Sequence, residues 1–336
     1  MLLFLDSMKY AKVDLHVHFD GSLDLKWQYE RAKLRNVISE DCTYDEYAYQ
    51  MYRNDYPSRE ERMKRFDIPL AVLQTKEDLY DGIYDMLRYL NDLGLVYAEI
   101  RFAPQLHCLN GLSQYEVVES LCEGMRKANE DFKIRSNLIC CLMHKGDSAR
   151  CNHQENVETI EVTKHFLGKG VVALDLAGYE NNCPFEEYGY LFEMAKEYNI
   201  PYTIHCGEMG KGEHVPLAIQ MGASRLGHGV QCVQNDAWVQ EVIETQIPLE
   251  VCVSSNCYDN KDFKGHPIHQ LLKLGAKVTI NSDNMNFIQT NVVKEYEILA
   301  ELGISEEVLK QCMLNAIECA FCDEETREWI YEQVCW

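Results

Sequence analysis

Three short segments hold the side chains of this chain that are best suited to chemistry. They are His16–His18, His205–Glu208 and Ser282–Asn284. Together they supply three imidazoles, one carboxylate suited to bind a metal ion and one suited to carry a proton. A divalent metal held by such ligands lowers the pKa of bound water from about 15.7 to roughly 7. These residue types therefore indicate metal-assisted hydrolysis.

Each of these segments ends or follows a compact run of β-branched residues. Side chains alternate along a strand, so His16 and His18 point to the same side. An isolated His-x-His pair is a weak signal for metal binding. His205 and Asp283 strengthen it, because imidazole and carboxylate groups are the ligands that zinc takes in proteins. The sequence predicts one divalent metal, most simply Zn²⁺, held by His16, His18, His205 and Asp283.

Short apolar runs recur along the chain, separated by segments of helix length. The predicted strands are residues 12–18, 96–102, 136–142, 171–176, 201–205, 224–227, 248–253 and 277–282. Several of these runs lack polar alternation, as expected for strands that are buried on both faces. Alternation of strands and helices is typical of parallel βα units.

Eight such units predict an α/β fold, a (β/α)8 TIM barrel. A chain of 336 residues, 46% of them hydrophobic, can bury the core of such a barrel. We expect residues 1–336 to form a single domain, with residues from about 24 to 95 as a helical insertion that forms a lid. The carboxyl ends of the strands meet on one face, where active sites of barrels lie. That face would bring the reactive segments together.

Composition excludes several other classes of protein. The net charge is −22, which argues against binding to nucleic acids or anionic membranes. No segment approaches the ~20 apolar residues of a membrane span. The 15 cysteines, an odd number without a signal peptide, fit reduced thiols in a cytoplasmic protein. Cys319 and Cys322 have CxxC spacing, but they lack a second pair and are expected to be buried free thiols.

Two further residues fit roles in proton transfer. Glu208 follows His205 in a turn that contains glycine, and it is either a carboxylate at a helix start or a general acid near the metal. His228 lies between Gly227 and Gly229, which permit close backbone approach. It is either a fourth metal ligand or a base beside the metal.

The other histidines are weaker candidates. His107 follows the second predicted strand and is expected near the mouth of the barrel. We expect a loop or surface position for the remaining ones, which are His144, His153, His165, His214, His266 and His269. No lysine ends the fourth strand, where a bridge between two metals would be expected in related hydrolases, so one metal is the simpler interpretation.

At this point the chain resembles the adenosine deaminase family of metal-dependent amidohydrolases, in particular its bacterial members. The matching stretches are KVDLHVHFDGSL at 12–23, YAEIRFAPQLH at 97–107, DLAGYE at 175–180, IHCGE at 204–208, SRLGHG at 224–229, SSN at 254–256 and TINSDN at 279–284. Their order and spacing also agree over nearly the whole chain.

The resemblance implies a role for each matching residue. Zinc would be held by His16, His18, His205 and Asp283, and Asp283 would also orient the attacking oxygen. Glu208 resembles the acid that protonates purine N1, and His228 resembles the base and electrostatic partner of the attacking water. The remaining expected contacts to substrate are made by His18, by Gly178 through its backbone N–H to N3, and by Asp20, which reads the ribose 5′-hydroxyl.

The chain departs from the family pattern after the eighth strand. The family often has a second aspartate, which bonds purine N7, whereas this chain has Asn284. N7 is an acceptor, and an amide N–H₂ donates at any pH. Asn284 is therefore expected to keep the contact.

A second departure lies in the predicted lid. Family members commonly have apolar residues on the helix before FDIPL, whereas this chain has Arg59 and Arg62, with Met63 and Phe66 as its apolar residues. The arginines either face outward or accept a polar or anionic group of the nucleoside. Met63 and Phe66 are expected to cover the substrate.

The sequence thus predicts a zinc-dependent enzyme that deaminates adenosine and 2′-deoxyadenosine to the inosine form and ammonia. The alternative substrates are adenine, a 5′-modified adenosine such as methylthioadenosine, and 6-amino-6-deoxyfutalosine. Because Asp20 would oppose a 5′-phosphate, AMP is disfavoured. The expected partner is a small purine nucleoside, with the protein as a monomer or small homo-oligomer. A barrel that only binds nucleosides would have no need of Glu208 beside His205.

Overall fold

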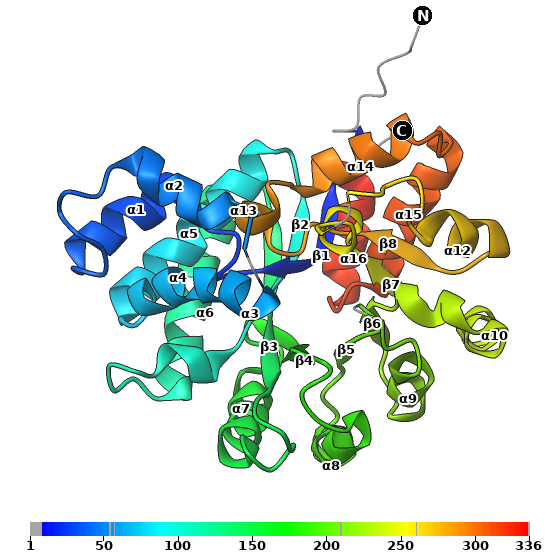
Figure 1. Ribbon diagram of the computed structural model, residues 1–336, viewed down its shortest axis with the longest axis horizontal. Coiled ribbons are helices and arrows are strands. Elements are labelled where there is room, and N and C mark those ends of the chain that lie inside the picture. Colours follow the sequence, from blue (N-terminus) through cyan, green and yellow to red (C-terminus); the bar gives the residue numbers. More distant parts are fainter. Residues whose placement is uncertain (1–8, 54, 57, 209, 260, 335–336) are drawn as a thin grey trace, which may run out of the picture.

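The computed structural model describes residues 9–53, 55–56, 58–208, 210–259 and 261–334, and within these ranges eight parallel strands alternate with helices (Figure 1). The strands are β1 (Val13–His18), β2 (Tyr97–Phe102), β3 (Arg135–His144), β4 (Val171–Gly178), β5 (Thr203–Cys206), β6 (Arg225–His228), β7 (Leu249–Val251) and β8 (Val278–Ile280). Each lies within two residues of a predicted strand at its start.

The strands pair in chain order. Strands β1 to β4 form one parallel set and β5 to β8 form a second. Parallel bridges between Leu174 and Tyr202, and between Val17 and Asp283, join the two sets at both seams. The sheet therefore closes into the predicted (β/α)8 barrel.

The interior of this barrel carries charge as well as apolar side chains. Strand β2 is buried along its whole length, although it includes Glu99 and Arg101. Arg225 on β6 and Glu250 on β7 are also fully buried. Because lone buried charges are costly, these side chains must be paired with one another.

Five α-helices separate β1 from β2. They are α1 (Leu25–Leu34), α2 (Tyr44–Tyr52), α3 (Arg59–Met63), α4 (Asp67–Val72) and α5 (Lys76–Asp92), with a 3₁₀ turn at Lys64–Phe66. Of the described residues in this insertion, those that line the central cavity lie between Arg62 and Leu70. Helix α5 instead packs its apolar face against the barrel core through residues such as Leu79 and Ile83. The part of the insertion beside the cavity is thus shorter than the predicted lid.

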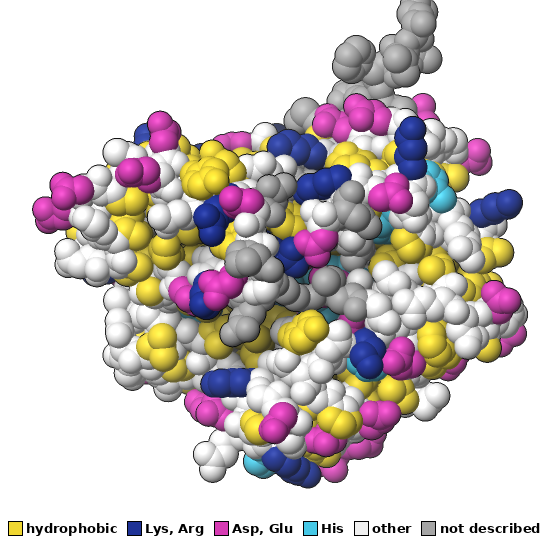
Figure 2. Space-filling model, viewed as in Figure 1, with side chains coloured by type: hydrophobic (Ala, Val, Ile, Leu, Met, Phe, Trp, Pro, Cys, Tyr) yellow, Lys and Arg dark blue, Asp and Glu magenta, His cyan; other side chains and the backbone are white. Residues whose placement is uncertain are grey.

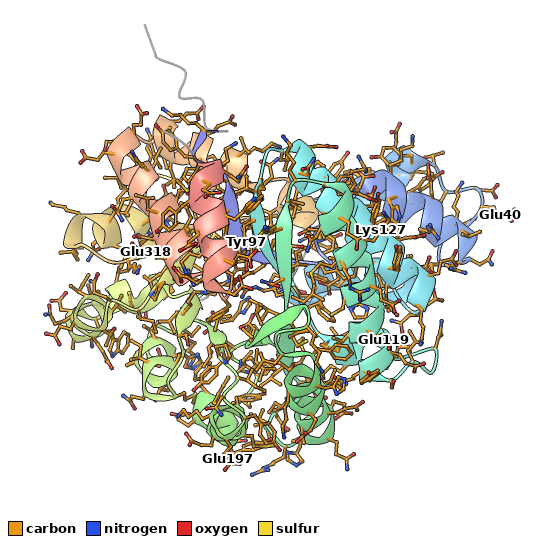
Figure 3. All side chains as sticks on the ribbon, turned by 180° about the vertical axis from the view of Figure 1, so that it is seen from behind. Glu40, Tyr97, Glu119, Lys127, Glu197 and Glu318 are labelled. Atoms are coloured by element: carbon orange, nitrogen blue, oxygen red, sulfur yellow. The ribbon has the colours of Figure 1, made fainter. Side chains whose placement is uncertain are left out.

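The remaining helices cover the outside and the back of the barrel, except for two short ones beside the cavity, at 253–256 and 285–288. They are α6 (Gln114–Asp131), α7 (His153–Phe166), α8 (Gly189–Glu197), α9 (His214–Gln220), α10 (Asp236–Thr245), α11 (Val253–Asn256), α12 (Ile268–Leu274), α13 (Met285–Ile288), α14 (Val292–Glu301), α15 (Glu306–Cys319) and α16 (Glu324–Gln333). Figure 3 shows α16 lying near Tyr97, at the amino end of β2. Arg135, which starts β3, lies over the ring of Trp329 at 4.5 Å. The C-terminal helices therefore cover the amino ends of the strands.

The surface carries the acidic excess in dispersed form. On the face drawn in Figure 2, acidic and basic side chains are interspersed. Within the described ranges, no helix is both long and apolar enough to cross a membrane. Cys319 and Cys322 are half-buried free thiols, and burial raises the pKa of Cys322 to about 11.

Close packing of α5 on α6 depends on Gly124. A Cβ at this position would lie 2.5 Å from the backbone oxygen of Tyr80 and 2.6 Å from Ile83 Cγ2. We expect Gly124→Ala to lower the free energy of unfolding by about 1–3 kcal/mol, because overpacking outweighs the gain in helix propensity. The control is Gly189→Ala, since a Cβ there has no neighbour within 4 Å. Urea unfolding curves in which both variants are as stable as the parent would contradict the prediction.

Candidate active site

Three histidines from two strands meet at the carboxyl end of the barrel. His16 and His18 belong to β1 and His205 belongs to β5. The ring centroids of His16 and His205 are 4.6 Å apart, and the Nε2 atoms of His18 and His205 are 3.2 Å apart. One nitrogen from each ring lies within 4.8 Å of the other two. The geometry could hold a metal ion.

Asp283 completes this group from the segment after β8. Its Oδ1 lies 3.4 Å from His18 Nε2 and 3.9 Å from His16 Nε2. The residue has φ of +61°, a left-handed conformation that is rare for a residue other than glycine. Strain of this kind collects at functional sites. The four ligands predicted from the sequence therefore lie side by side.

The His16 ring is oriented by a buried carboxylate. His16 Nδ1 donates to Glu250 Oε2 at 2.8 Å. Arg101 and Arg225 also donate to Glu250, each at 2.7 Å. Burial alone would raise the pKa of Glu250, but the two guanidinium groups hold it well below its usual range. Glu250 is thus a charged acceptor that leaves His16 Nε2 free of a proton.

The His205 ring is oriented in the same manner. Its Nδ1 lies 2.8 Å from Asp175 Oδ2, and Arg101 donates to that same oxygen at 2.8 Å. A ligating histidine commonly donates its other ring N–H to a carboxylate, which sets the tautomer. Arg101 therefore connects the carboxylates behind two of the histidines.

These donor groups fit a divalent cation. His16 Nε2 is buried and has no hydrogen-bond partner, although it points into the histidine group. Burial holds the pKa of His16 and of His18 well below the usual value, so both rings are neutral, as metal binding requires. Three imidazoles and a carboxylate are a donor set that zinc accepts.

His228 lies against the same group from the end of β6. Its ring centroid is 4.9 Å from that of His16, and its φ is +64°. A Cβ on Gly227 would come within 3.1 Å of His16 Cε1, so the close approach expected from the glycine is present. The Asn256 amide donates to His228 Nδ1 at 3.3 Å. A neutral His228 therefore carries its proton on Nε2.

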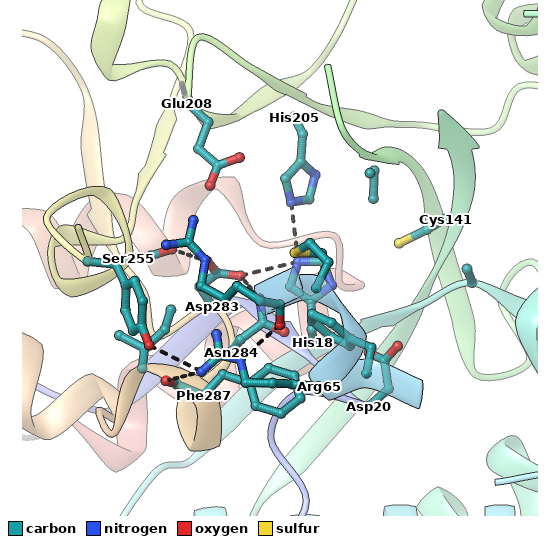
Figure 4. A pocket seen from close by; sticks show the side chains of 18 of the residues that line it. His18, Asp20, Arg65, Cys141, His205, Glu208, Ser255, Asp283, Asn284 and Phe287 are labelled. Atoms are coloured by element: carbon teal, nitrogen blue, oxygen red, sulfur yellow. Dashed lines mark hydrogen bonds and ion pairs between the residues drawn. The ribbon is translucent and has the colours of Figure 1, made fainter. Parts of the chain in front are cut away.

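Glu208 lies in the turn after β5 and is half-buried. One ligand atom each from Glu208, His228 and Asp283 lie within 4.8 Å of one another. Figure 4 shows the Glu208 carboxylate directed into the pocket, toward Asp283. Ser255 Oγ donates to Asp283 Oδ2 at 2.5 Å. Glu208 and two of the grouped histidines, His18 and His205, thus line one pocket.

This pocket is a cavity of about 550 Å³, which is in the range of small-molecule sites. Its walls include the predicted substrate-binding residues His18, Asp20, Gly178, Asn284, Met63 and Phe66. In Figure 4, Asp20 and Arg65 lie on the side of the pocket opposite to Glu208. The cavity therefore presents different groups on its two sides.

Three of these wall residues have distinct local environments. Gly178 has φ of +104°, and a Cβ there would lie 3.1 Å from the His144 backbone oxygen. Asp20 is buried, which raises the pKa of its carboxyl to about 6. The Asn284 amide donates to Asp283 Oδ1 at 2.6 Å, and its own Oδ1 is buried without a partner. One amide hydrogen of Asn284 is used within the protein, which leaves the second for a ligand.

Arg62 of α3 has a different outcome from either expectation. Arg62 lines the cavity, but its guanidinium pairs with Asp259 and lies over the Tyr258 ring at 4.9 Å. Its charge is therefore balanced within the protein. The side chain of Arg59 lies outside the described part of the structure. Met63 is 42% exposed at the cavity rim, whereas Phe66 packs edge-on against Phe287 at 4.5 Å.

The expected loop or surface position is wrong for two histidines, because His144 ends β3, His214 begins α9 and both are buried. His266 lies in a loop as expected, although its side chain is buried. His144 packs against Tyr188, His214 stacks on Phe185, and the backbone N–H of Ile268 donates to His266 at 3.0 Å. His107 is buried near the cavity and bonds the Leu73 carbonyl.

Sequence reasoning missed the carboxylates that orient the metal-binding histidines. Asp175 was available in the matching stretch 175–180, and Glu250 is a charge within an apolar strand. A charged residue in a strand that is buried on both faces is itself a signal, because burial requires a charged partner. Ser255 and Asn256 gave no comparable signal, since serine and asparagine are common in loops.

Replacement of Glu250 should weaken metal binding. Glu250→Gln removes the charged acceptor of His16 Nδ1, and loss of such a partner typically lowers metal affinity about 10–100-fold. Competition with a chromogenic chelator measures this affinity. The control is Asp78→Asn, another fully buried carboxylate that pairs with Arg31 and Arg35. Equal metal affinities for Glu250→Gln and the parent would disprove the role of Glu250.

Bacterial relatives are similar to this chain over nearly its whole length. The chain is 37% identical to adenosine deaminase of Haemophilus ducreyi over 330 residues, covering 95% of this chain and 94% of the relative. It is 38% identical to adenosine deaminase of Clostridium botulinum strain Okra over 326 residues, covering 95% and 96% of the two chains.

Solved structures show the same fold at lower identity. An amidohydrolase from Burkholderia ambifaria with bound zinc superposes with a TM-score of 0.86 at 21% identity, covering 98% of this chain and 92% of that one. Adenine deaminase from Arthrobacter aurescens superposes with a TM-score of 0.83 at 22% identity, covering 96% and 97%. The family model described as adenosine deaminase matches residues 11–335. The chain belongs to the adenosine deaminase family.

Proposed function

We propose that this protein converts adenosine and 2′-deoxyadenosine, by hydrolysis, to inosine or 2′-deoxyinosine and ammonia. One observation carries the proposal. Glu208, a carboxylate that could carry a proton, lines a cavity of about 550 Å³ together with Asp283 and two of the three grouped histidines, His18 and His205. The full-length similarity to bacterial adenosine deaminases supports the same activity.

The chemistry requires an acid because C6 of adenine is a poor electrophile. Glu208 would donate its proton to N1, which draws electron density from C6. Water then adds at C6, the C6–N bond breaks and ammonia leaves. One proton of the water passes to the departing nitrogen, and the proton of the resulting C6 hydroxyl returns to Glu208, so the product is the 6-oxo purine with a hydrogen on N1 and the acid is regenerated.

The opposite side of the reacting carbon would be served by His228 and Asp283. Asp283 can accept a proton from the attacking water, since a carboxylate is an acceptor in its ionised form. His228 would orient that water by donating from Nε2, because Asn256 already occupies Nδ1. This assigns His228 to orientation and electrostatic support.

A single divalent ion, for which we propose Zn²⁺, would be held by His16, His18, His205 and Asp283. When bound, such an ion supplies Lewis-acid activation of water at neutral pH. Glu250 and Asp175 keep two of the histidines in the tautomer that presents Nε2 to the ion. Residues 1–336 would act as one domain, with residues 62–70 of the insertion at about 24–95 covering the cavity.

Substrate recognition would use three wall residues. The Gly178 backbone N–H would bond N3, and the free amide hydrogen of Asn284 would bond N7. Asp20 would accept from the ribose 5′-hydroxyl. A carboxylate at that position would repel a 5′-phosphate. The Arg62 charge is paired with Asp259, and the Arg65 guanidinium donates to the Met51 and Phe287 carbonyls. The nucleoside is therefore favoured over the nucleotide.

A substrate panel tests this proposal. We expect the highest kcat/KM for adenosine and 2′-deoxyadenosine, with lower values for adenine, 5′-methylthioadenosine, 6-amino-6-deoxyfutalosine and AMP. The ultraviolet absorbance change from the 6-amino to the 6-oxo purine gives the rate. Preference for free adenine would remove any role for Asp20, and no turnover of any substrate would refute the function.

Loss of the proton donor should reduce chemistry rather than folding. We expect Glu208→Gln to lower kcat for adenosine at least ~10²-fold, the usual contribution of a general acid. The metal content should stay that of the parent, since Glu208 is outside the proposed ligand set. Glu213→Gln, an exposed carboxylate in the same loop region, is the matched control and should retain kcat. Near-normal turnover by Glu208→Gln would exclude this acid role.

A further inference from the structure

A second carboxylate, that of Glu180, accepts hydrogen bonds from the turn that carries Glu208. Glu180, at the end of the matching stretch after β4, is only 3% exposed. Its Oε2 accepts the backbone N–H of Gly207 at 2.9 Å, and its Oε1 accepts the backbone N–H of Glu208 at 3.1 Å. Both oxygens of one buried anion thus bond consecutive amides of the turn.

Glu180 is itself held by the first residue of α9. His214 Nδ1 donates to Glu180 Oε2 at 3.0 Å. The His214 ring stacks on Phe185, with centroids 4.5 Å apart and planes at 16°. Since both rings are buried, His214 has little freedom to turn away from Glu180.

The turn also packs directly on α9. Gly207 has φ of +58°, and a Cβ there would lie 2.7 Å from Val215 Cγ2. Val215 follows His214 in the helix. Helix α9 therefore fixes the position of the turn by packing against Gly207. Through His214 and Glu180 it also fixes the direction of the N–H groups of the turn.

We propose that Glu180, oriented by His214, is a positioning residue that aims the Glu208 side chain for proton transfer. The inference rests on the proposed function, in which Glu208 is the acid. The Glu208 side chain starts at the Cα that adjoins the amide bonded by Glu180, so a change in the direction of that amide moves the carboxyl. A displacement of about 1 Å in a reacting group can cost up to ~10²-fold in rate.

An amide cannot replace Glu180 in this arrangement. Glutamine has one acceptor oxygen, and its N–H₂ would face either a backbone N–H or His214. One donor of the turn would then lose its partner in a buried setting. Glu180→Gln is therefore close in volume to the parent but breaks the paired contact.

The first measurement compares two buried carboxylates. We expect Glu180→Gln to lower kcat for adenosine about 10-fold or more, with KM and bound metal close to the parent values. Asp78→Asn removes a buried charge in α5, away from the cavity, and should lower thermal stability without changing kcat. A kcat for Glu180→Gln within about twofold of the parent would overturn the inference.

The second measurement asks whether Glu180 acts through Glu208. In the Glu208→Gln background, the further loss from Glu180→Gln should shrink to within about twofold, since the group to be aimed is absent. Equal losses in both backgrounds would assign Glu180 a structural role only. Should Glu180→Gln fail to fold, His214→Gln replaces it in the same double-mutant comparison with Glu208→Gln, because it removes the donor that orients Glu180.

The two hypotheses fail in different ways. If the parent protein does not deaminate any aminopurine, the proposed function fails before the variants are compared. If the parent and Asp78→Asn are active, and Glu180→Gln lowers kcat equally in the parent and in the Glu208→Gln background, the proposed function stands and the positioning role of Glu180 is rejected.

Discussion

The buried ion pairs of Arg101 are the constraint on which the candidate site depends. This guanidinium lies inside the barrel and bonds both Glu250 and Asp175, at 2.7 and 2.8 Å. Neither carboxylate could remain charged there without such a partner, because transfer of a lone charge from water to a protein interior costs several kcal/mol. Since each carboxylate also receives the Nδ1–H of one histidine, the same network directs two Nε2 atoms toward one point.

A charged barrel interior has a consequence for the fold as well. Arg225 joins Glu250 to Glu99 on β2, so ionic contacts cross the barrel between strands that are distant in sequence. Removal of one member leaves its partners buried and uncompensated, which is costly. Stability and the proposed metal binding would therefore depend on the same side chains, because buried core residues orient the histidines.

The proton-carrying side of the cavity is built differently. His228 at the end of β6 and Asp283 in the segment after β8 occupy left-handed backbone conformations, and Glu208 lies on a turn. Strained residues persist where the surrounding structure over-determines them. Here the determinants are Ser255 and Asn256, which bond Asp283 and His228. Buried carboxylates thus orient the histidines of the proposed metal site, whereas side chains after β7 hold His228 and Asp283 in place.

The rim beside the insertion shows how context changes a charged residue. Arg62 lines the cavity, yet its side chain is only 15% exposed because it pairs with Asp259 and covers Tyr258. The contact joins two segments that are 197 residues apart in the chain. The ion pair with Asp259 connects α3 to the barrel rim and neutralises the charge of Arg62. Residues deeper in the cavity would therefore recognise the substrate.

The sequence by itself determined the eight strands and the reactive residues at their ends. Buried parallel strands read as apolar runs, and polar residues that follow such runs stand out against them. The histidines at 16, 18 and 205, with Asp283, could be found in this way, and the order of the strands then required a barrel. Family resemblance added roles for Glu208 and His228 that residue types alone left open.

Only the tertiary structure decided which residues support that site. Glu250, Asp175 and Glu180 act on residues far from them in the chain, and no local pattern encodes the partner of a side chain. The burial of His214 and the pairing of Arg62 were missed for the same reason, because each depends on a neighbour that folding brings from another segment. Periodicity reports how a residue lies within its own element, whereas hydrogen bonds and ion pairs across the barrel depend on how the elements close around one another.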